Sequence, residues 1–245
     1  MKMKIKRKTY FWKNKYPLMG QEDHKGDKLL YLMPGMGARS SIFKGLRFPS
    51  GIRPVYMEWL MPEGDEDLDH YTERLIRHYA IRPGSILLGM SFGGIMVHEI
   101  AKRLEVEKLI FVSTVKTHEA FPHHFHWGRK LRIWNLLPYG LITHPMRTAA
   151  WVPVGRIKKR LALYDQYMSI RDSAYFRWAM KRILTWQSPL PPVPYLHIHG
   201  DRDRIFPLRH LKGEVYPIAG GTHLAVMTHP KKINRILAPY LSEEA

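Results

Sequence analysis

A serine between two glycines is the residue of this chain best placed to act as a nucleophile. Gly89-Met90-Ser91-Phe92-Gly93 follows a short apolar run and precedes residues with helical periodicity. Strand, sharp turn and helix form the context in which the pattern G-x-S-x-G makes a nucleophile elbow. The two glycines lack a Cβ, so the chain can turn hard around Ser91 and other backbone can approach closely. We therefore expect Ser91 at the carboxyl edge of a sheet, above a helix N-terminus.

A serine hydroxyl attacks well only when a base takes its proton. His223, in a glycine-rich loop before the last predicted helix, is the candidate base. It would later protonate the leaving group. The backbone N–H groups of Phe92 and of Met36, which lies in the loop Pro34-Gly35-Met36-Gly37, are the expected oxyanion donors.

The elements that must position these residues are short apolar runs alternating with helical patterns. Predicted strands cover residues 29–33, 54–59, 85–90, 108–113, 194–199 and 214–218, and predicted helices include 65–79 and 230–241. This alternation is typical of an α/β protein with a doubly wound, mostly parallel sheet. No strand pattern occurs in 116–189, which we expect to be an inserted helical cap rich in Trp, Tyr and Met. Residues 29–115 and 190–245 would then form the core, and residues 1–28 a basic N-terminal arm.

The order of these motifs resembles the α/β-hydrolase fold, in which serine, acid and histidine follow one another along the chain. The segment 199–207, His-Gly-Asp-Arg-Asp-Arg-Ile-Phe-Pro, is similar to that fold's HGxxDxxxP acid loop, which implies Asp203 as the acid. Asp203 would fix the tautomer of His223 and stabilise its imidazolium. Asp201 is the rival acid, and we interpret it as a turn former. The oxyanion loop, Pro34-Gly35-Met36-Gly37, differs from the family's common pattern in having Pro34, where a His frequently precedes the glycine.

The composition and the charge distribution indicate which partners and which cellular location to expect. The chain has 245 residues, 45% hydrophobic residues, no cysteine and a formal net charge of +18. Seven Lys and Arg without an acid occupy residues 1–16, and thirteen Lys and Arg against three acids occupy 116–189. This charge favours anionic partners, either an anionic or carrier-linked substrate or the surface of an anionic membrane. No secretory signal or membrane span is apparent, so a cytoplasmic location is expected.

The sequence contains two clusters of potential metal ligands, and we expect neither to bind a metal ion. His123, His124 and His126 have no carboxylate nearer than Glu119, and we read them as a polar rim of the cap. The acids at positions 63, 65, 66, 67 and 69 suit the first turn of a solvated helix. We therefore expect neither a metal nor a cofactor.

The resulting hypothesis is a serine hydrolase that cleaves a carboxylic ester or thioester through an acyl-enzyme intermediate. Acyl transfer and C–C bond hydrolysis are alternative chemistries, because a fold alone does not select a substrate. A non-catalytic ligand-binding protein on the same scaffold is the alternative outside enzymes. Specific nucleic-acid binding is not expected, since charge alone supports it and no binding motif is present.

Overall fold

The computed structural model describes residues 26–144, 155, 162, 165–190 and 193–242. Most of the predicted basic arm therefore lies outside the described residues. So do Ile157, Leu161 and Tyr164, which with Met168 have the helical spacing that predicts one apolar stripe in the inserted segment. Within the described part of the chain, no helix has the length and apolar character needed to cross a membrane.

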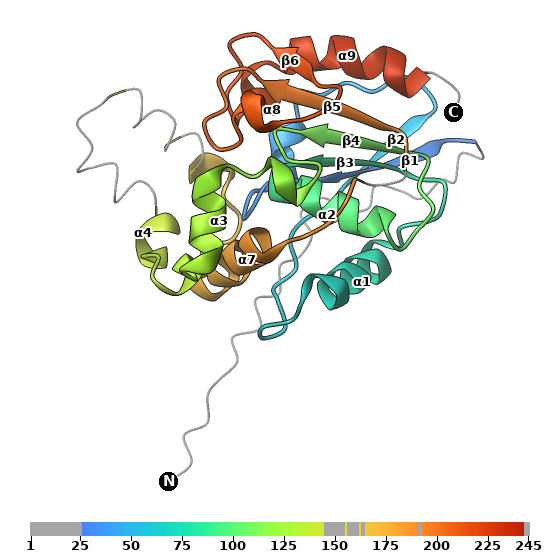
Figure 1. Cartoon of the computed structure of the whole chain (residues 1–245). Helices are drawn as coiled ribbons and strands as arrows, with labels where there is room; N and C mark the ends of the chain where they lie inside the picture. The colour runs from blue at the N-terminus through green and yellow to red at the C-terminus, as the bar shows by residue number, and fades with distance from the viewer. Residues whose placement is uncertain (1–25, 145–154, 156–161, 163–164, 191–192, 243–245) are drawn as a thin grey trace.

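Six strands form one parallel sheet in the order β2-β1-β3-β4-β5-β6 (Figure 1). They are β1 (Lys28–Met33), β2 (Ile52–Tyr56), β3 (Ile86–Met90), β4 (Lys108–Val112), β5 (Tyr195–Gly200) and β6 (Tyr216–Ile218). The central strands are buried on both faces, which explains their continuous apolar runs. Gly89 lies opposite Met33 and Phe111, so the ends of β1, β3 and β4 meet at the edge where Ser91 follows. The predicted doubly wound parallel sheet is confirmed.

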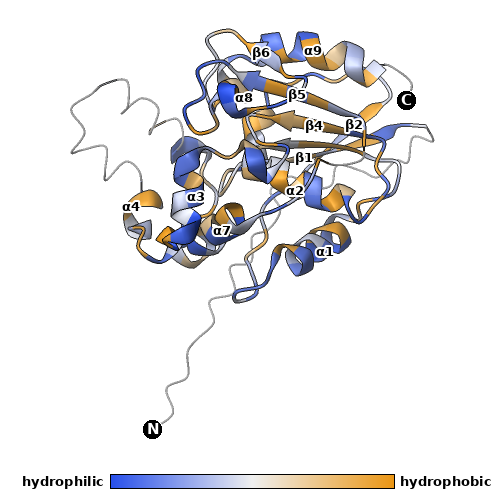
Figure 2. Cartoon of the chain, in the orientation of Figure 1, coloured by the Kyte–Doolittle hydropathy of each residue, from blue (hydrophilic) through white to orange (hydrophobic). Residues whose placement is uncertain are grey.

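Helices cover both faces of the sheet. One face packs against α1 (Leu68–Tyr79), α2 (Phe92–Ala101) and α7 (Ser173–Thr185), and the other against η1 (Ser40–Phe43), α8 (Ala225–Thr228) and α9 (Pro230–Ser242). Alternate residues of each strand serve the two faces: Leu109 and Phe111 join the α2 side, whereas Ile110 joins the α9 side. Figure 2 shows β4 mainly in hydrophobic colours, whereas β5, α1 and α9 carry hydrophilic residues as well. The alternation of hydrophobic residues thus builds two apolar cores around one sheet.

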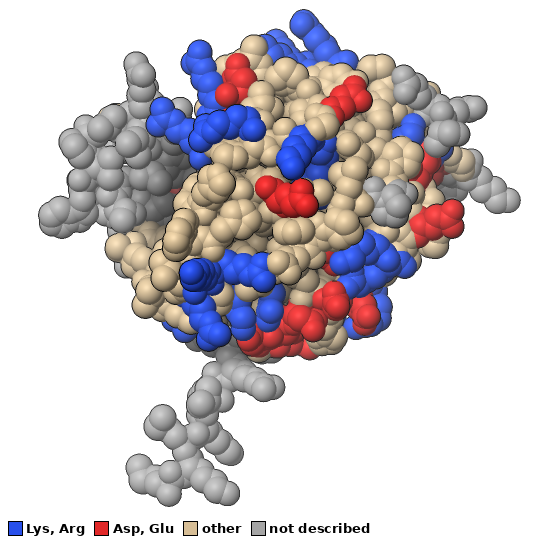
Figure 3. All heavy atoms as spheres, in the orientation of Figure 1, with Lys and Arg blue, Asp and Glu red and all other residues tan. Residues whose placement is uncertain are grey.

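Helix α1 begins at Leu68, three residues later than the predicted start at Asp65. The Asp67 side chain caps it by accepting a hydrogen bond of 2.8 Å from the backbone N–H of His70. The acids before it lie in a loop and form ion pairs: Glu63 and Glu66 with Arg74, and Asp65 with Lys181 and Arg182. Figure 3 shows acidic side chains gathered at the lower edge of the molecule, where Figure 1 has the loop before α1.

Glu63, Glu66 and His70 bring potential ligand atoms together, and Arg74 forms ion pairs with both glutamates. Four of the five acids, at positions 63, 65, 67 and 69, are exposed at the start of α1, as predicted. Those at 63, 65 and 66 precede the helix rather than lying in its first turn, and they form ion pairs with α1 and α7.

Helices fill the described part of the segment between β4 and β5. It contains η2 (His118–Ala120), α3 (His123–Lys130), η3 (Ile133–Asn135), α4 (Tyr139–Ile142) and α7, and η4 (Leu208–His210) follows β5. Met168 makes an isolated antiparallel bridge with Ala38, which the sequence pattern did not predict. Helix α7 packs on the core through Trp178, whose ring centroid lies 4.4 Å from that of Tyr71 and whose Nε1–H donates to the carbonyl of Glu66 at 2.7 Å. Trp178 of this segment therefore packs against the core.

Substituting the second glycine of the elbow should destabilise the fold. A Cβ at Gly93 would overlap the carbonyl oxygens of Met33 and Pro34, which are backbone atoms and cannot rotate away. We expect Gly93→Ala to lower the free energy of unfolding by about 1–3 kcal/mol or more, the usual cost of overpacking. Gly140→Ala is the matched control, since a Cβ there meets nothing within 4 Å and α4 would favour alanine. Urea unfolding measures both variants, and equal stability of the two would contradict the predicted clash.

Candidate active site

Ser91 lies in the sharp turn between β3 and α2. Its backbone has φ 53° and ψ −120°, a strained conformation for a residue with a side chain. Two hydrogen bonds hold the turn: the Ser91 N–H donates to Val112 O at 3.1 Å, and Thr114 Oγ1 donates to Ser91 O at 2.7 Å. The residues after β4 thus lock the backbone around Ser91 in place, and its hydroxyl lines a pocket.

Ser91, His223 and Asp203 come together at the carboxyl edge of the sheet, although they are far apart in sequence. Ser91 Oγ lies 2.9 Å from His223 Nε2, and His223 Nδ1 lies 2.8 Å from Asp203 Oδ2. An ionised carboxylate can only accept, so the proton of a neutral imidazole is placed on Nδ1. Nε2 then has a free lone pair facing the serine hydroxyl, which is the geometry of a general base.

The Asp203 carboxylate is buried and has a partner for each oxygen. Oδ1 accepts from the N–H groups of Ile205 at 2.8 Å and Phe206 at 3.1 Å, while Oδ2 faces His223 and His199. Burial by itself raises the pKa of Asp203, but the hydrogen bonds from His199 and His223 outweigh it and hold the pKa well below its ordinary value. The carboxylate therefore stays ionised at neutral pH.

His199 is a site residue that the sequence pattern did not identify beyond a place in a strand. Its side chain is fully buried in β5, and Nε2 lies 2.8 Å from Phe206 O and 3.2 Å from Asp203 Oδ2. A carbonyl and a carboxylate both accept, so Nε2 carries the proton and donates to them. The four-residue spacing of His199 and Asp203 across the turn after β5 was the available signal. His199 stabilises the ionised acid and fixes the loop that carries it.

The lowered pKa of Asp203 predicts an acid-dependent loss of stability. In an unfolded chain the group titrates near its ordinary value of about 3.9. A pKa depressed by folding adds stability that is present above that value and is lost as the pH falls below it. Between pH 5 and pH 3, the free energy of unfolding of the wild type should therefore fall more steeply than that of Asp203→Asn. Urea titrations at each pH measure the two slopes, and parallel slopes would contradict the prediction.

The two predicted oxyanion donors flank Ser91. Phe92 is the first residue of α2, whose first N–H groups have no acceptor within the helix. Met36 follows Gly35, and a Cβ at Gly35 would lie 3.5 Å from the Cβ of Ser91, so this loop passes directly over the nucleophile.

Trp59 connects the Gly35–Gly37 turn with the start of α2. Its place at the end of a predicted strand did not reveal this role. Its Nε1–H donates to Gly35 O at 2.8 Å, and its ring stacks on that of Phe92 with centroids 4.8 Å apart. Tyr175 of α7 adds a second fixed point by accepting from the N–H of Gly37 at 3.1 Å. The core and α7 together hold the Gly35–Gly37 turn rigid beside Ser91, as an oxyanion site requires.

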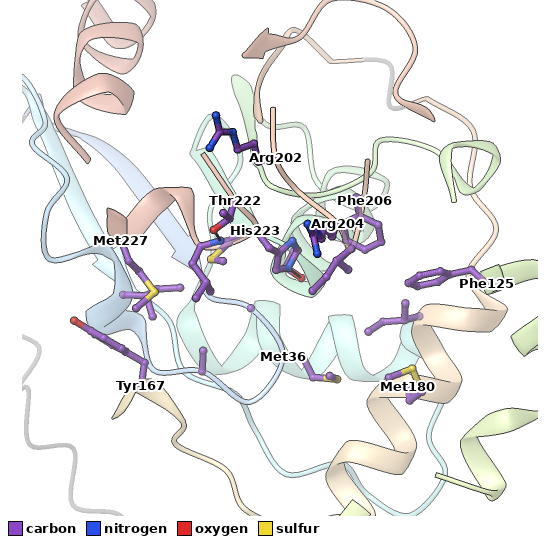
Figure 4. A pocket seen from close by; sticks show the side chains of 18 residues that line it. Met36, Phe125, Tyr167, Met180, Arg202, Arg204, Phe206, Thr222, His223 and Met227 are labelled. Atoms are coloured by element: carbon purple, nitrogen blue, oxygen red, sulfur yellow. Dashed lines mark hydrogen bonds between the residues drawn. The ribbon is translucent and has the colours of Figure 1, made fainter. Parts of the chain in front are cut away.

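A pocket of about 400 Å³ opens at Ser91 and His223. Its walls are mainly apolar and come from both the sheet edge and the helices between β4 and β5. In Figure 4, Tyr167 and Met227 lie on one side of His223, and Phe125 and Met180 on the other. The lining also includes Met36, Ala38, Ile42, Met90, Ile183, Ile205, Phe206 and Leu224. A pocket of this size and character suits the apolar part of a small molecule.

The remaining candidates lie apart from the serine. Asp201 is exposed and lies in a turn that the hydrogen bond from the Asp203 N–H to Gly200 O closes at 3.1 Å, as predicted. Its side chain also accepts from the N–H of Gly220 at 2.8 Å, which ties the acid loop to the loop of His223. His123, His124 and His126 are exposed on α3, and His123 stacks edge-on against His210. They form no metal-ligand cluster with the residues that the structure describes.

Known proteins resemble this chain in structure but not detectably in sequence. No protein-family model matches the chain, and no curated protein sequence does. Solved structures match it over most of its length. The enol-lactonase from Burkholderia xenovorans LB400 is 15% identical, with a TM-score of 0.65, over 91% of this chain and 94% of that one. A thermophilic esterase from Thermogutta terrifontis is 16% identical, with a TM-score of 0.58, over 87% and 89%.

A third match comes from the epoxide hydrolases of metagenomes from hot environments, which are assigned to the α/β-hydrolase superfamily. It is 15% identical, with a TM-score of 0.60, over 89% of this chain and 92% of that one. Together with the parallel sheet, these matches show that the chain has the α/β-hydrolase fold.

Proposed function

We propose that this protein is a serine hydrolase that cleaves a carboxylic ester or thioester through an acyl-enzyme intermediate. The observation that carries the proposal is the continuous contact from Ser91 Oγ through His223 to the buried Asp203, at 2.9 Å and 2.8 Å. Ser91 and His223 also line the apolar pocket. Structural neighbours that include an esterase and an enol-lactonase agree with hydrolysis at this edge of the fold.

In the proposed reaction, Ser91 Oγ attacks the carbonyl carbon of the substrate while His223 Nε2 takes the hydroxyl proton. The carbonyl oxygen becomes an oxyanion beside the N–H groups of Phe92 and Met36. Collapse of this tetrahedral intermediate breaks the bond to the leaving group, which receives the proton from His223. A water molecule then attacks the acyl-enzyme by the same route in reverse, and the free acid departs.

The pocket supports an apolar acyl group rather than a polar one. Its walls near the nucleophile come from flexible Met side chains, Met36, Met180 and Met227, and from Phe125. Thioether chains adapt to ligands of different shape, so they favour a range of aliphatic acids over one rigid group. We propose that the helices between β4 and β5 act as the lid of this pocket, since α3 and α7 supply one of its walls.

A series of p-nitrophenyl esters tests this function. We expect kcat/KM to rise from acetate to butyrate or octanoate, because each buried methylene contributes roughly 0.8 kcal/mol to binding the transition state. Ser91→Ala should lose turnover of every ester in the series. Purified protein that is folded by circular dichroism yet hydrolyses none of the esters would favour the non-catalytic ligand-binding alternative. Hydrolysis that persists in Ser91→Ala would exclude Ser91 as the nucleophile.

A further inference from the structure

Two arginines flank the buried acid of the site. Arg202 and Arg204 are the immediate neighbours of Asp203, and all three belong to the loop after β5. The Asp203 side chain points inward and is held by the N–H groups of Ile205 and Phe206. Both arginines are exposed, yet both line the pocket that contains Ser91. An exposed side chain that lines a pocket lies at its mouth. In Figure 4 the Arg204 side chain lies beside His223, whereas the Arg202 guanidinium points away from the other lining side chains, so Arg204 places its positive charge where the apolar pocket meets solvent.

No carboxylate in the described part of the chain pairs with either guanidinium. Arg74, Arg103, Arg171 and Arg182 each pair with a carboxylate, but no such pair or side-chain hydrogen bond is formed by Arg202 or Arg204 within the described residues. The acid between them, Asp203, is already occupied by His199 and His223. A guanidinium offers planar, paired donors that match a carboxylate or a phosphate. The pocket mouth is therefore built to receive an anion from outside the chain.

The side of the scissile bond follows from the position of His223. In Figure 4, Arg202 and Arg204 lie on the same side of the pocket as Thr222 and His223, opposite Met36 and Met180. In the proposed reaction His223 protonates the leaving group, so the leaving group departs on this side. The acyl group would occupy the apolar interior on the opposite side.

We infer that Arg204, with Arg202, binds an anionic leaving group. The substrate class is then an ester or thioester with an apolar acyl chain and a carboxylate or phosphate on its alcohol or thiol part. This inference rests on the proposed function, because it assigns a substrate to the same serine. It places the specificity of the site in two residues that do not take part in bond breaking.

Two matched esters test the inference. One is 4-butyryloxybenzoate, whose leaving group carries a carboxylate, and the other is its neutral methyl ester. In the wild type, we expect kcat/KM for the anionic ester to exceed that for the neutral one. The double variant Arg202→Gln/Arg204→Gln should lower this ratio roughly tenfold to hundredfold, the usual size of a lost charge-assisted hydrogen bond, and mainly through KM. Added salt should lower the wild-type ratio as well.

Arg209→Gln is the control, since Arg209 is exposed in η4 on the same stretch of chain but does not line the pocket. It should keep the wild-type ratio. An equal ratio in the wild type and the double variant would overturn the inference, and so would an equal loss in Arg209→Gln. A third ester, the p-nitrophenyl monoester of succinic acid, carries its carboxylate on the acyl side. If the double variant loses selectivity only for this ester, the assignment to the leaving group is wrong. Hydrolysis of the neutral ester separates failure of this inference from failure of the proposed function.

Discussion

Replacement of His223 by alanine is expected to lower kcat for ester hydrolysis by roughly 10⁴ to 10⁶-fold. The imidazole is the group within hydrogen-bond distance of Ser91 Oγ that can accept its proton, and the contact is 2.9 Å. Without it, the hydroxyl remains protonated and the leaving group departs without an acid. Single-turnover and steady-state rates with p-nitrophenyl butyrate measure the loss.

His78→Ala provides the matched control for this variant, because His78 is exposed on α1 and takes no part in the pocket. Its rate should stay within about twofold of the wild type. Thermal unfolding of both variants shows whether a lost rate reflects chemistry or folding. A folded His223→Ala protein with a rate within tenfold of the wild type would contradict the assignment of the base.

The second large effect is expected for Asp203→Asn, which should lower kcat by about 10⁴-fold. An asparagine amide can donate to His223 Nδ1, and the imidazole would then carry its proton on Nε2, facing Ser91. The serine would lose its acceptor although the shape of the site is almost unchanged. The same substitution two residues away, Asp201→Asn, keeps an oxygen to accept from the Gly220 N–H and should change kcat by no more than a few-fold. Equal losses in the two variants would contradict the choice of Asp203.

Much of the fold could be predicted from the sequence because parallel strands buried on both faces appear as continuous apolar runs. The six strands, their parallel arrangement and the sharp turn at Ser91 followed from this pattern and from the glycines around it, although β2 covers Ile52–Tyr56 rather than the predicted 54–59. The start of α1 did not, because a row of acids suits both a helix start and a loop. Asp67 is the cap, while its neighbours Glu66 and Asp65 form ion pairs instead. Glu66 pairs with Arg74, and Asp65 pairs with Lys181 and Arg182, which lie more than a hundred residues away in the sequence.

The residues that surround the nucleophile were less accessible to prediction. Trp59 acts on the site through one hydrogen bond and one stacked ring, and neither contact leaves a spacing pattern in the sequence. His199 did leave one signal, its four-residue spacing from Asp203, but its position within β5 is that of any buried strand residue. Arg202 and Arg204 could be read only as part of a charged loop until the pocket placed them at its mouth.

The predicted contact with an anionic membrane stays a prediction. Among the described residues, Trp127, Leu131 and Leu136 are exposed on the helical segment between β4 and β5, next to the basic side chains of Arg129 and Lys130. Such a surface, with apolar groups beside positive ones, is the one that contact with anionic lipid would use.

The central claim is that Ser91 is an activated nucleophile, and the intact mass of the protein after treatment with a fluorophosphonate tests it most directly. The reagent phosphonylates a serine whose proton is taken by a neighbouring base. We predict a single adduct on the wild type, located at Ser91 by peptide mapping and missing from Ser91→Ala and His223→Ala. A folded wild type that gains no adduct, even with a reagent small enough to enter the pocket, or an adduct that persists in Ser91→Ala, would contradict the claim.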